Sequence, residues 1–303
     1  MPKILIVDDE PAIRFLLQDI LSELTYETLT AENGVEALAV LGKDPGVDMI
    51  ISDINMPKMM GFELLAKVET LYPHIKRVLI TAYNVEDYLA LSVQHGISNI
   101  LTKTTPFNFD EVTSVIQNLL SENVFGIDHF LRPNTPTHSI AITDPSKIHD
   151  YTLQMLESLR PPGNSHNLEM VVVELLNNAI FYGIKDMDPE KKEDWNDQFI
   201  LNEGEVNLSW GKDEEKIIFS VSDSGGKLTK KKVLHWLSRQ IDKDDTGMPV
   251  GLLDFHGRGF FISREYVDRL IINIKKNIRT EIICLQYVKG SYQGHKPLLI
   301  NEI

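Results

Sequence analysis

The stretch Lys3-Ile4-Leu5-Ile6-Val7-Asp8-Asp9 decides the fold of the first part of the chain. Its apolar run predicts a short buried strand, and two carboxylates follow at the carboxyl end of that strand. Three later apolar runs also end in a polar residue, and these residues are Asp53, Thr81 and Lys103. Because the carboxyl ends of parallel strands face one crevice of an open sheet, we expect these polar groups to lie together.

The chemistry of this group points to phosphoryl transfer. Carboxylates repel one another in a small site unless a positive charge lies among them. Mg²⁺ suits such a site because it binds one or two carboxylates together with phosphate oxygens. Asp53 is then the candidate phosphoryl acceptor, with Thr81 and Lys103 contacting the transferred oxygens. Taken singly, each residue is explained equally well as a polar strand end that faces water, but their joint occurrence favours a site.

Several motifs in a fixed order resemble the receiver domain of bacterial two-component response regulators. They are Val7-Asp8-Asp9-Glu10, Asp53, Met56-Pro57, Gly61-Phe62-Glu63-Leu64-Leu65, Thr81-Ala82 and Lys103. The resemblance implies a flavodoxin-like, doubly wound α/β fold and an Asp53 that takes a phosphoryl group from a histidine kinase. It also implies that Asp9, Asp53 and the backbone carbonyl of Asn55 hold Mg²⁺, with Asp8 supporting the metal through water. The chain departs from the family pattern at Ile100, where an aromatic residue is usual, and at Thr104, where proline is usual.

Length and composition limit the number of domains, the class of binding partner and the cellular location that we expect. The chain has 303 residues, of which 43% are hydrophobic, and this predicts two ordinary globular domains. A formal net charge of −14 argues against direct nucleic-acid binding, which needs a basic face. The single cysteine, Cys284, excludes an internal disulfide framework. No apolar stretch reaches the ~18 residues of a membrane span and no signal peptide precedes the first strand, so we expect a cytoplasmic protein without a membrane partner.

The chain divides into segments with different patterns. Apolar runs alternate five times with amphipathic helical segments at 11–24, 34–41, 61–71, 85–95 and 110–120. Glycine, proline and asparagine then mark a turn-rich joint. We therefore expect a receiver domain at 1–120, a linker at 121–137, a second domain at 138–290 and a tail at 291–303. The charged insertion 185–202 is a solvated excursion or, less simply, a docking loop, and the tail docks either on its own domain or on a partner.

The second domain carries its own pattern of polar residues. We expect a strand at 139–142, a helix at 145–159 and another at 165–181, in which Glu174 and Asn178 share one face. That face is explained either by contact with solvent or by a function. A strand at 216–221 leads to Asp223-Ser224-Gly225-Gly226, where glycines allow close approach of a ligand. Gly257-Arg258-Gly259 opens a helix at 260–268, and such a helix start can bind phosphate.

In this order the motifs resemble the N, G1 and G2 boxes of the GHKL ATPase superfamily, whose Bergerat fold is an α/β sandwich. Glu174 to Ala179, Tyr182-Gly183 and Gly257 to Ile262 are most similar to the anti-sigma factor serine kinases. The resemblance implies that Asn178 binds Mg²⁺ bridging the phosphates of ATP, and that Asp223 accepts a hydrogen bond from the adenine amino group. It further implies that Gly225 packs under the base, that residues 243–255 form a lid, and that Glu174 is a catalytic base. The residues expected against the phosphates are Gly257, Arg258 and Gly259.

Together the two resemblances imply a response regulator with an ATP-binding output domain. The output domain acts either as a protein serine/threonine kinase in a partner-switching pathway or as an ATP-gated sequestration module without kinase activity. The expected partners are a histidine kinase, an anti-sigma antagonist-type protein or a sigma factor, and a second copy of the chain in a homodimer. A hybrid histidine kinase is disfavoured, because the segment 121–137 is too short for a two-helix phosphoacceptor domain.

Overall fold

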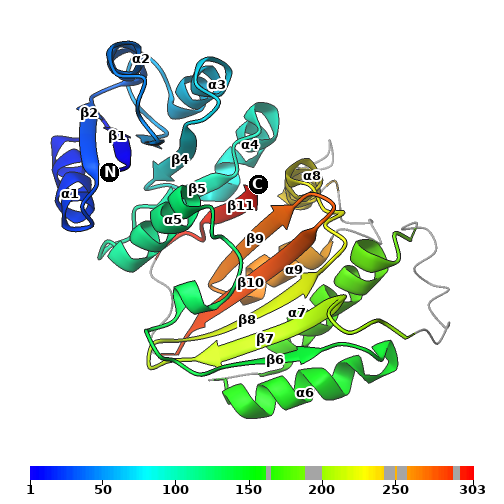
Figure 1. Cartoon of the computed structure of the whole chain (residues 1–303). Coiled ribbons are helices and arrows are strands. Elements are labelled where there is room, and N and C mark those ends of the chain that lie inside the picture. Colours follow the sequence, from blue (N-terminus) through cyan, green and yellow to red (C-terminus); the bar gives the residue numbers. More distant parts are fainter. Residues whose placement is uncertain (162–164, 188–199, 242–249, 251–257, 289–293) are drawn as a thin grey trace. The chain divides into compact units, whose positions relative to one another are not determined.

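The computed structural model describes residues 1–161, 165–187, 200–241, 250, 258–288 and 294–303. The chain forms two compact units (Figure 1). The first unit contains residues 1–124 and 293–299, and the second contains residues 125–292 and 300–303. Within the described ranges, no helix combines the length and apolarity that crossing a membrane requires.

The first unit is built on a parallel sheet with the strand order β2-β1-β3-β4-β5. This order is that of a flavodoxin-like doubly wound sheet, as the sequence predicted. The central strands are buried on both faces and are accordingly rich in isoleucine, leucine and valine. The strands are β1 (Lys3–Val7), β2 (Glu27–Ala31), β3 (Met49–Asp53), β4 (Lys76–Thr81) and β5 (Asn99–Thr102).

Helices cover both faces of this sheet (Figure 1). Their first turns are fixed locally: Asn33 and Asn108 each accept a hydrogen bond from a backbone N–H three residues later, at 3.1 Å. The predicted helical segment 85–95 begins as a short 3₁₀ turn, η1 (Val85–Tyr88), and continues as α4 (Leu89–His95). The other helices are α1 (Pro11–Glu23), α2 (Gly34–Lys43), α3 (Gly61–Leu71) and α5 (Phe109–Ser121).

Part of the predicted tail is a strand of the first unit. Leu298 and Leu299, the first residues of β11 (Leu298–Glu302), pair antiparallel with Ile100 and Asn99 of β5. Both leucines are buried. Two residues at the β5 edge of the parallel sheet are therefore paired with a segment that is remote in sequence.

The second unit is an α/β sandwich with the strand order β9-β10-β8-β7-β6, and every neighbouring pair is antiparallel. Helices α6, α7 and α9 pack side by side on one face of the sheet (Figure 1). The strands are β6 (Thr137–Ala141), β7 (Val206–Lys212), β8 (Lys216–Asp223), β9 (Arg269–Lys275) and β10 (Arg279–Tyr287). The helices are α6 (Ile148–Leu159), α7 (Ser165–Asn178), α8 (Lys230–Ile241) and α9 (Arg258–Tyr266), with the 3₁₀ turns η2 (Asp128–Phe130) and η3 (Pro145–Lys147).

The helix predicted at 165–181 changes its geometry near its end. Regular α-helix stops at Asn178, and Ala179–Ile184 continues as a π-helical turn, η4. Such turns are rare and are frequently found at functional sites. The turn places Gly183 against the end of β8, where an added Cβ would lie 2.6 Å from the carboxyl carbon of Asp223.

The predicted linker is largely part of the second unit. The backbone N–H of Gly126 donates to Glu281 Oε2 at 2.7 Å, and Arg279 lies over the ring of Phe125. Arg132 binds Glu214 at 2.8 Å and Glu215 at 2.6 Å through its two terminal nitrogens. Residues 125–132 are thus held to the sheet by charge-assisted hydrogen bonds.

Helix α3 begins with a close approach that only glycine permits. A Cβ on Gly61 would lie 2.2 Å from the carbonyl oxygen of Asp53 and 2.9 Å from the side chain of Leu79. Backbone cannot withdraw as a flexible side chain can, so a larger residue here forces α3 away from β3. Glycine at position 61 therefore allows the start of α3 to pack against the backbone of Asp53.

We predict that Gly61→Ala lowers the free energy of unfolding by about 1 to 3 kcal/mol, the usual cost of overpacking. Urea denaturation of the full chain, followed by circular dichroism, measures the change. Gly42→Ala is the matched control, because Gly42 also lies in a helix and an added Cβ would meet nothing within 4 Å. That control should stabilise the protein by about 0.5 to 1 kcal/mol through helix propensity. Equal stability of the two variants would contradict the packing argument.

Candidate functional site

The first candidate site lies at the carboxyl edge of the parallel sheet. The ammonium of Lys103, which follows β5, lies 2.8 Å from Asp8 Oδ2 and 2.6 Å from Asp53 Oδ1. Asp8, Asp53 and Thr81 are buried, whereas Asp9 is exposed. The sequence predicted that these strand ends meet, and the structure brings Asp8, Asp53 and Lys103 into direct contact.

Backbone donors hold the acidic side chains in place. The N–H of Asn55 donates to Asp53 Oδ2 at 2.6 Å, and the N–H of Glu10 donates to Asp8 Oδ1 at 2.9 Å. The N–H of Lys103 donates to the carbonyl of Thr81 at 2.7 Å. Each carboxylate therefore has one backbone donor and one contact to the same ammonium, which fixes both side chains.

Charge balance explains why two buried carboxylates are tolerated here. Burial by itself disfavours the ammonium of Lys103, but its hydrogen bonds to Asp53 and Asp8 outweigh that cost and raise its pKa. Lys103 therefore stays charged at neutral pH. Replacing it with a neutral residue would leave two buried carboxylates with no adjacent cation, which is strongly unfavourable.

The donor set fits a magnesium ion that is completed by other oxygens. Among the described residues, no group of three or more His, Cys, Asp or Glu side chains is arranged to hold a metal ion. Mg²⁺, however, commonly uses only one or two carboxylates and takes its other ligands from waters and phosphate. The predicted metal ligands are Asp9, Asp53 and the backbone carbonyl of Asn55, with Asp8 acting through water. In the structure, Asp8 and Asp53 both contact Lys103, whereas Asp9 is exposed.

One contact at this site was missed by the sequence analysis. The side-chain amide of Asn55 donates to the hydroxyl of Tyr88 at 2.6 Å. The ring of Tyr88 in turn stacks on Phe62 with centroids 6.1 Å apart. No spacing rule relates residues 55 and 88, because their contact depends on where η1 packs.

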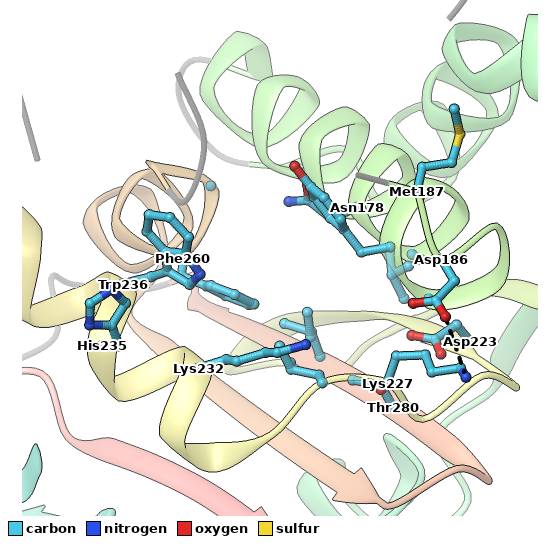
Figure 2. A pocket seen from close by; sticks show the side chains of 17 residues that line it. Asn178, Asp186, Met187, Asp223, Lys227, Lys232, His235, Trp236, Phe260 and Thr280 are labelled. Atoms are coloured by element: carbon cyan, nitrogen blue, oxygen red, sulfur yellow. Dashed lines mark ion pairs between the residues drawn. The ribbon is translucent and has the colours of Figure 1, made fainter. Parts of the chain in front are cut away.

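The second candidate site is a cavity of about 480 Å³ in the second unit (Figure 2). Its volume is within the range of small-molecule sites, about 300 to 1,000 Å³. Asn178, Asp223 and Gly259, which are three of the predicted nucleotide-binding residues, all line it. The apolar part of the wall comes from the sheet and from α9, through residues such as Val221, Ile282 and Phe260.

Asp223 is the buried acidic group of this cavity. Its Oδ1 accepts hydrogen bonds from the backbone N–H groups of Gly225 and Gly226, both at 3.0 Å. Burial raises the pKa of Asp223 to about 6, and the two backbone donors oppose that rise only in part. Because the folded state binds this proton more tightly than the unfolded chain does, the group's contribution to stability falls as pH rises from about 4 through 6.

Two glycines allow the cavity wall to close. A Cβ on Gly225 would lie 1.8 Å from the carbonyl oxygen of Gly183, so the turn after β8 packs directly on the π-helical turn. A Cβ on Gly259 would lie 2.6 Å from Glu174 Oε1 and 2.8 Å from Asn178 Nδ2. The amide of Asn178 also donates to Glu174 Oε1 at 3.1 Å. The acid and the amide of α7 therefore meet the start of α9.

Some predicted site residues lie outside the described part of the chain. Gly257 and nearly all of the predicted lid, 243–255, are among them, as is the side chain of Arg258. Conversely, the cavity includes residues that the sequence analysis did not consider. Lys232, His235 and Trp236 come from α8, a helix that was not predicted. Its apolar residues at three- and four-residue spacing could have revealed it.

Comparisons with known proteins bear on the first unit. The family model of the response regulator receiver domain matches residues 4–117. Sporulation initiation phosphotransferase F of Bacillus subtilis is 33% identical over 118 residues, which cover 39% of this chain and 93% of that protein. Transcriptional regulatory protein GlrR of Escherichia coli is 32% identical over 136 residues, which cover 45% of this chain but only 30% of that protein.

Matches to solved structures cover about the same share of this chain. The response regulator protein TrrA of Thermotoga maritima, in complex with Mg²⁺-BeF, shares 39% identity. The match covers 39% of this chain and 99% of that one, with a TM-score of 0.36.

The receiver-domain prediction from the sequence is confirmed. It rests on the fold of the first unit, the matched residues 4–117 and the relative that is covered almost completely. Through these residues the chain belongs to the family of response regulator receiver domain proteins of two-component systems.

Proposed function

We propose that this protein is a response regulator in which phosphorylation of Asp53 controls an ATP-binding output unit of the GHKL type. The observation that carries the proposal is the convergence of Asn178, Asp223 and Gly259 on one cavity. These residues come from a helix, a strand end and a second helix start that are far apart in sequence. Their sequence motifs predict a nucleotide site, which supports the proposal.

In the receiver unit, Asp53 is proposed to take the phosphoryl group from a phosphohistidine of a histidine kinase. A carboxylate oxygen of Asp53 forms the new P–O bond while the P–N bond of the phosphohistidine breaks. Lys103 is positioned to pair with a phosphoryl oxygen, because its ammonium already touches Asp53 Oδ1. A bound Mg²⁺ would supply further charge compensation for the transferred oxygens.

In the output unit, Asp223 is proposed to accept a hydrogen bond from the amino group of adenine. Its Oδ1 accepts hydrogen bonds from two backbone donors, and Oδ2 is the oxygen proposed to meet the ligand. Asn178 and Gly259 lie on the same cavity and would face the phosphates, with Mg²⁺ bridging phosphate oxygens and Asn178. The volume of about 480 Å³ is sufficient for a nucleotide.

Kinase activity is the favoured output, of the anti-sigma factor type and directed at a serine or threonine. Glu174 supports this proposal: its Oε1 lies beside Asn178 at the start of α9, where a base could take a proton from an incoming hydroxyl. The second candidate is sequestration of a partner in an ATP-dependent manner, without transfer. Asn178 and Asp223 suffice for that function, and Glu174 would then serve only to orient Asn178.

The partners follow from the same proposal. A receiver domain implies a histidine kinase as phosphodonor. The output unit would act on an anti-sigma antagonist-type protein or a sigma factor, in a partner-switching pathway in the cytoplasm. The net charge of −14 favours protein or nucleotide partners over nucleic acid.

Phosphorylation of Asp53 can be tested with a small phosphodonor such as acetyl phosphate and Mg²⁺. We expect an acid-stable, base-labile acyl phosphate on the full chain, detected by radiolabel or mass shift. Asp53→Asn should abolish it, whereas Asp19→Asn, at an exposed position of α1, should retain it. Label that persists in Asp53→Asn would assign the acceptor to another residue.

The nucleotide site can be tested by calorimetry of the full chain with MgATP. Asp223→Ala should weaken binding by about tenfold or more, since it removes a charge-assisted hydrogen bond. Protonation of Asp223 also removes the acceptor, so affinity should fall as pH falls through about 6. Titration of one group with a pKa of about 6 lowers the MgATP affinity by about tenfold between pH 7.5 and pH 5.

This pH dependence should disappear in Asp223→Ala. Any dependence that remains there comes from groups other than Asp223. Parent-like affinity of Asp223→Ala at pH 7.5 would mean that the ligand does not use this carboxylate.

The two outputs can be separated at Glu174. If Glu174 is the base, Glu174→Gln should keep MgATP affinity nearly unchanged while phosphate transfer to a validated target falls by roughly 10²- to 10⁴-fold. Glu169→Gln on the same helix is the control and should transfer at the parent rate. Transfer by Glu174→Gln at the parent rate would remove Glu174 as the base, and the absence of transfer by the parent protein would support sequestration.

A further inference from the structure

Helix α8 forms a wall of the cavity that the predicted nucleotide motifs do not account for. Lys232, His235 and Trp236 are spaced three and four residues apart, so they share one face of α8. Lys227 and Leu228 line the cavity just before this helix. The wall therefore brings two ammonium groups to the cavity that contains the buried carboxylate of Asp223 (Figure 2).

The two lysines differ in their partners. The ammonium of Lys227 lies 3.7 Å from Asp186 Oδ2, an ion pair at the exposed edge of the cavity (Figure 2). Within the described part of the chain, the ammonium of Lys232 has no hydrogen-bond or ion-pair partner, although its side chain extends from α8 into the cavity (Figure 2). Once Lys227 and Asp186 neutralise each other, the described residues that line the cavity leave one carboxylate, Asp223, and one ammonium, Lys232.

Asp223 and Lys232 differ in how far their side chains are buried. Asp223 is 7% exposed, whereas Lys232 belongs to the exposed class. A ligand that satisfies both has an uncharged end with an N–H donor, buried against Asp223, and an anionic end near the rim. Such an anion stays partly hydrated, and a flexible lysine can follow it.

We propose that Lys232 binds the phosphates of the nucleotide and thereby selects nucleotides over the corresponding nucleoside. This inference rests on the proposed ATP-binding function and adds a specificity-determining residue to it. The exposure of Lys232 favours the phosphates over the base as its partner. A base that reaches Asp223 is buried with it, whereas charged phosphates are costly to bury and remain at the rim.

The test is calorimetry on the full chain with Mg²⁺, using ATP and adenosine as separate ligands. Lys232→Gln should weaken ATP binding by about three- to tenfold, the size expected for a partly exposed ion contact. Adenosine binding should not change. Raising the salt concentration should weaken ATP binding less in Lys232→Gln than in the parent, because a screened charge contact has been removed.

Two further variants make the test specific. Lys231→Gln removes the same charge from the adjacent exposed position of α8, which does not line the cavity, and should bind both ligands as the parent does. Lys232→Arg keeps the charge and should restore most of the ATP affinity.

Three outcomes would overturn the inference. Parent-like ATP affinity of Lys232→Gln would show that Lys232 does not contact the phosphates, and an equal loss for adenosine would move its contact to the base or ribose. An equal loss of ATP affinity in Lys231→Gln would show that the net charge of α8, and not a contact of Lys232, causes the effect. If the parent protein binds neither ATP nor adenosine, the nucleotide proposal itself fails, which is distinct from the first three results.

Discussion

A carboxylate that is buried needs a compensating charge or a set of donors, and both units of this chain satisfy that requirement at their candidate sites. In the first unit, Asp8 and Asp53 share the ammonium of Lys103. In the second unit, Asp223 has two backbone N–H donors on one oxygen. The start of α3 packs on the backbone of Asp53, and the turn after β8 donates its backbone N–H groups to Asp223.

The kind of compensation decides what chemistry each carboxylate can support. The ammonium of Lys103 opposes the rise in the pKa of Asp53 that burial causes, although the pKa stays above its ordinary value, and it lies beside the oxygen of Asp53 that would accept a group. In the second unit, burial raises the pKa of Asp223 to about 6, and the backbone donors oppose that rise only in part. The first arrangement suits a nucleophile that forms a bond. The second suits a carboxylate whose role is to recognise a donor, and whose recognition depends on pH near neutrality.

The positions of several site residues could be predicted from the sequence. These are positions at which a polar residue has a single physical reason to occur. Apolar runs ending in Asp8, Asp53, Thr81 and Lys103 located the receiver site, because parallel strands bring their carboxyl ends to one edge. The spacing of Glu174 and Asn178 placed both on one face of α7, where they are in contact. The alternation implies a strand between the first two helices, but the bounds of β2 could not be predicted, since its partly exposed residues, Glu27 to Ala31, form no apolar run.

Contacts that depend on tertiary packing could not be predicted. The approach of Tyr88 to Asn55 and the contribution of α8 to the cavity each join segments with no shared sequence period. The π-helical turn at Ala179–Ile184 lies in a segment whose residues read as ordinary helix up to Phe181. In this turn Gly183 packs closely on Gly225, a tertiary contact that local propensity does not predict.

During translation, β5 leaves the ribosome long before the segment that covers its edge. Ile100 and Asn99 pair with Leu298 and Leu299, and all of residues 125–292 are synthesised in between. Until then the nascent receiver unit has an open sheet edge, which is a known route to association with other chains. A pairing this distant in sequence also forms late in folding, because the loop must close first. The pairing of β5 with β11 can therefore form only in chains that have been synthesised as far as β11.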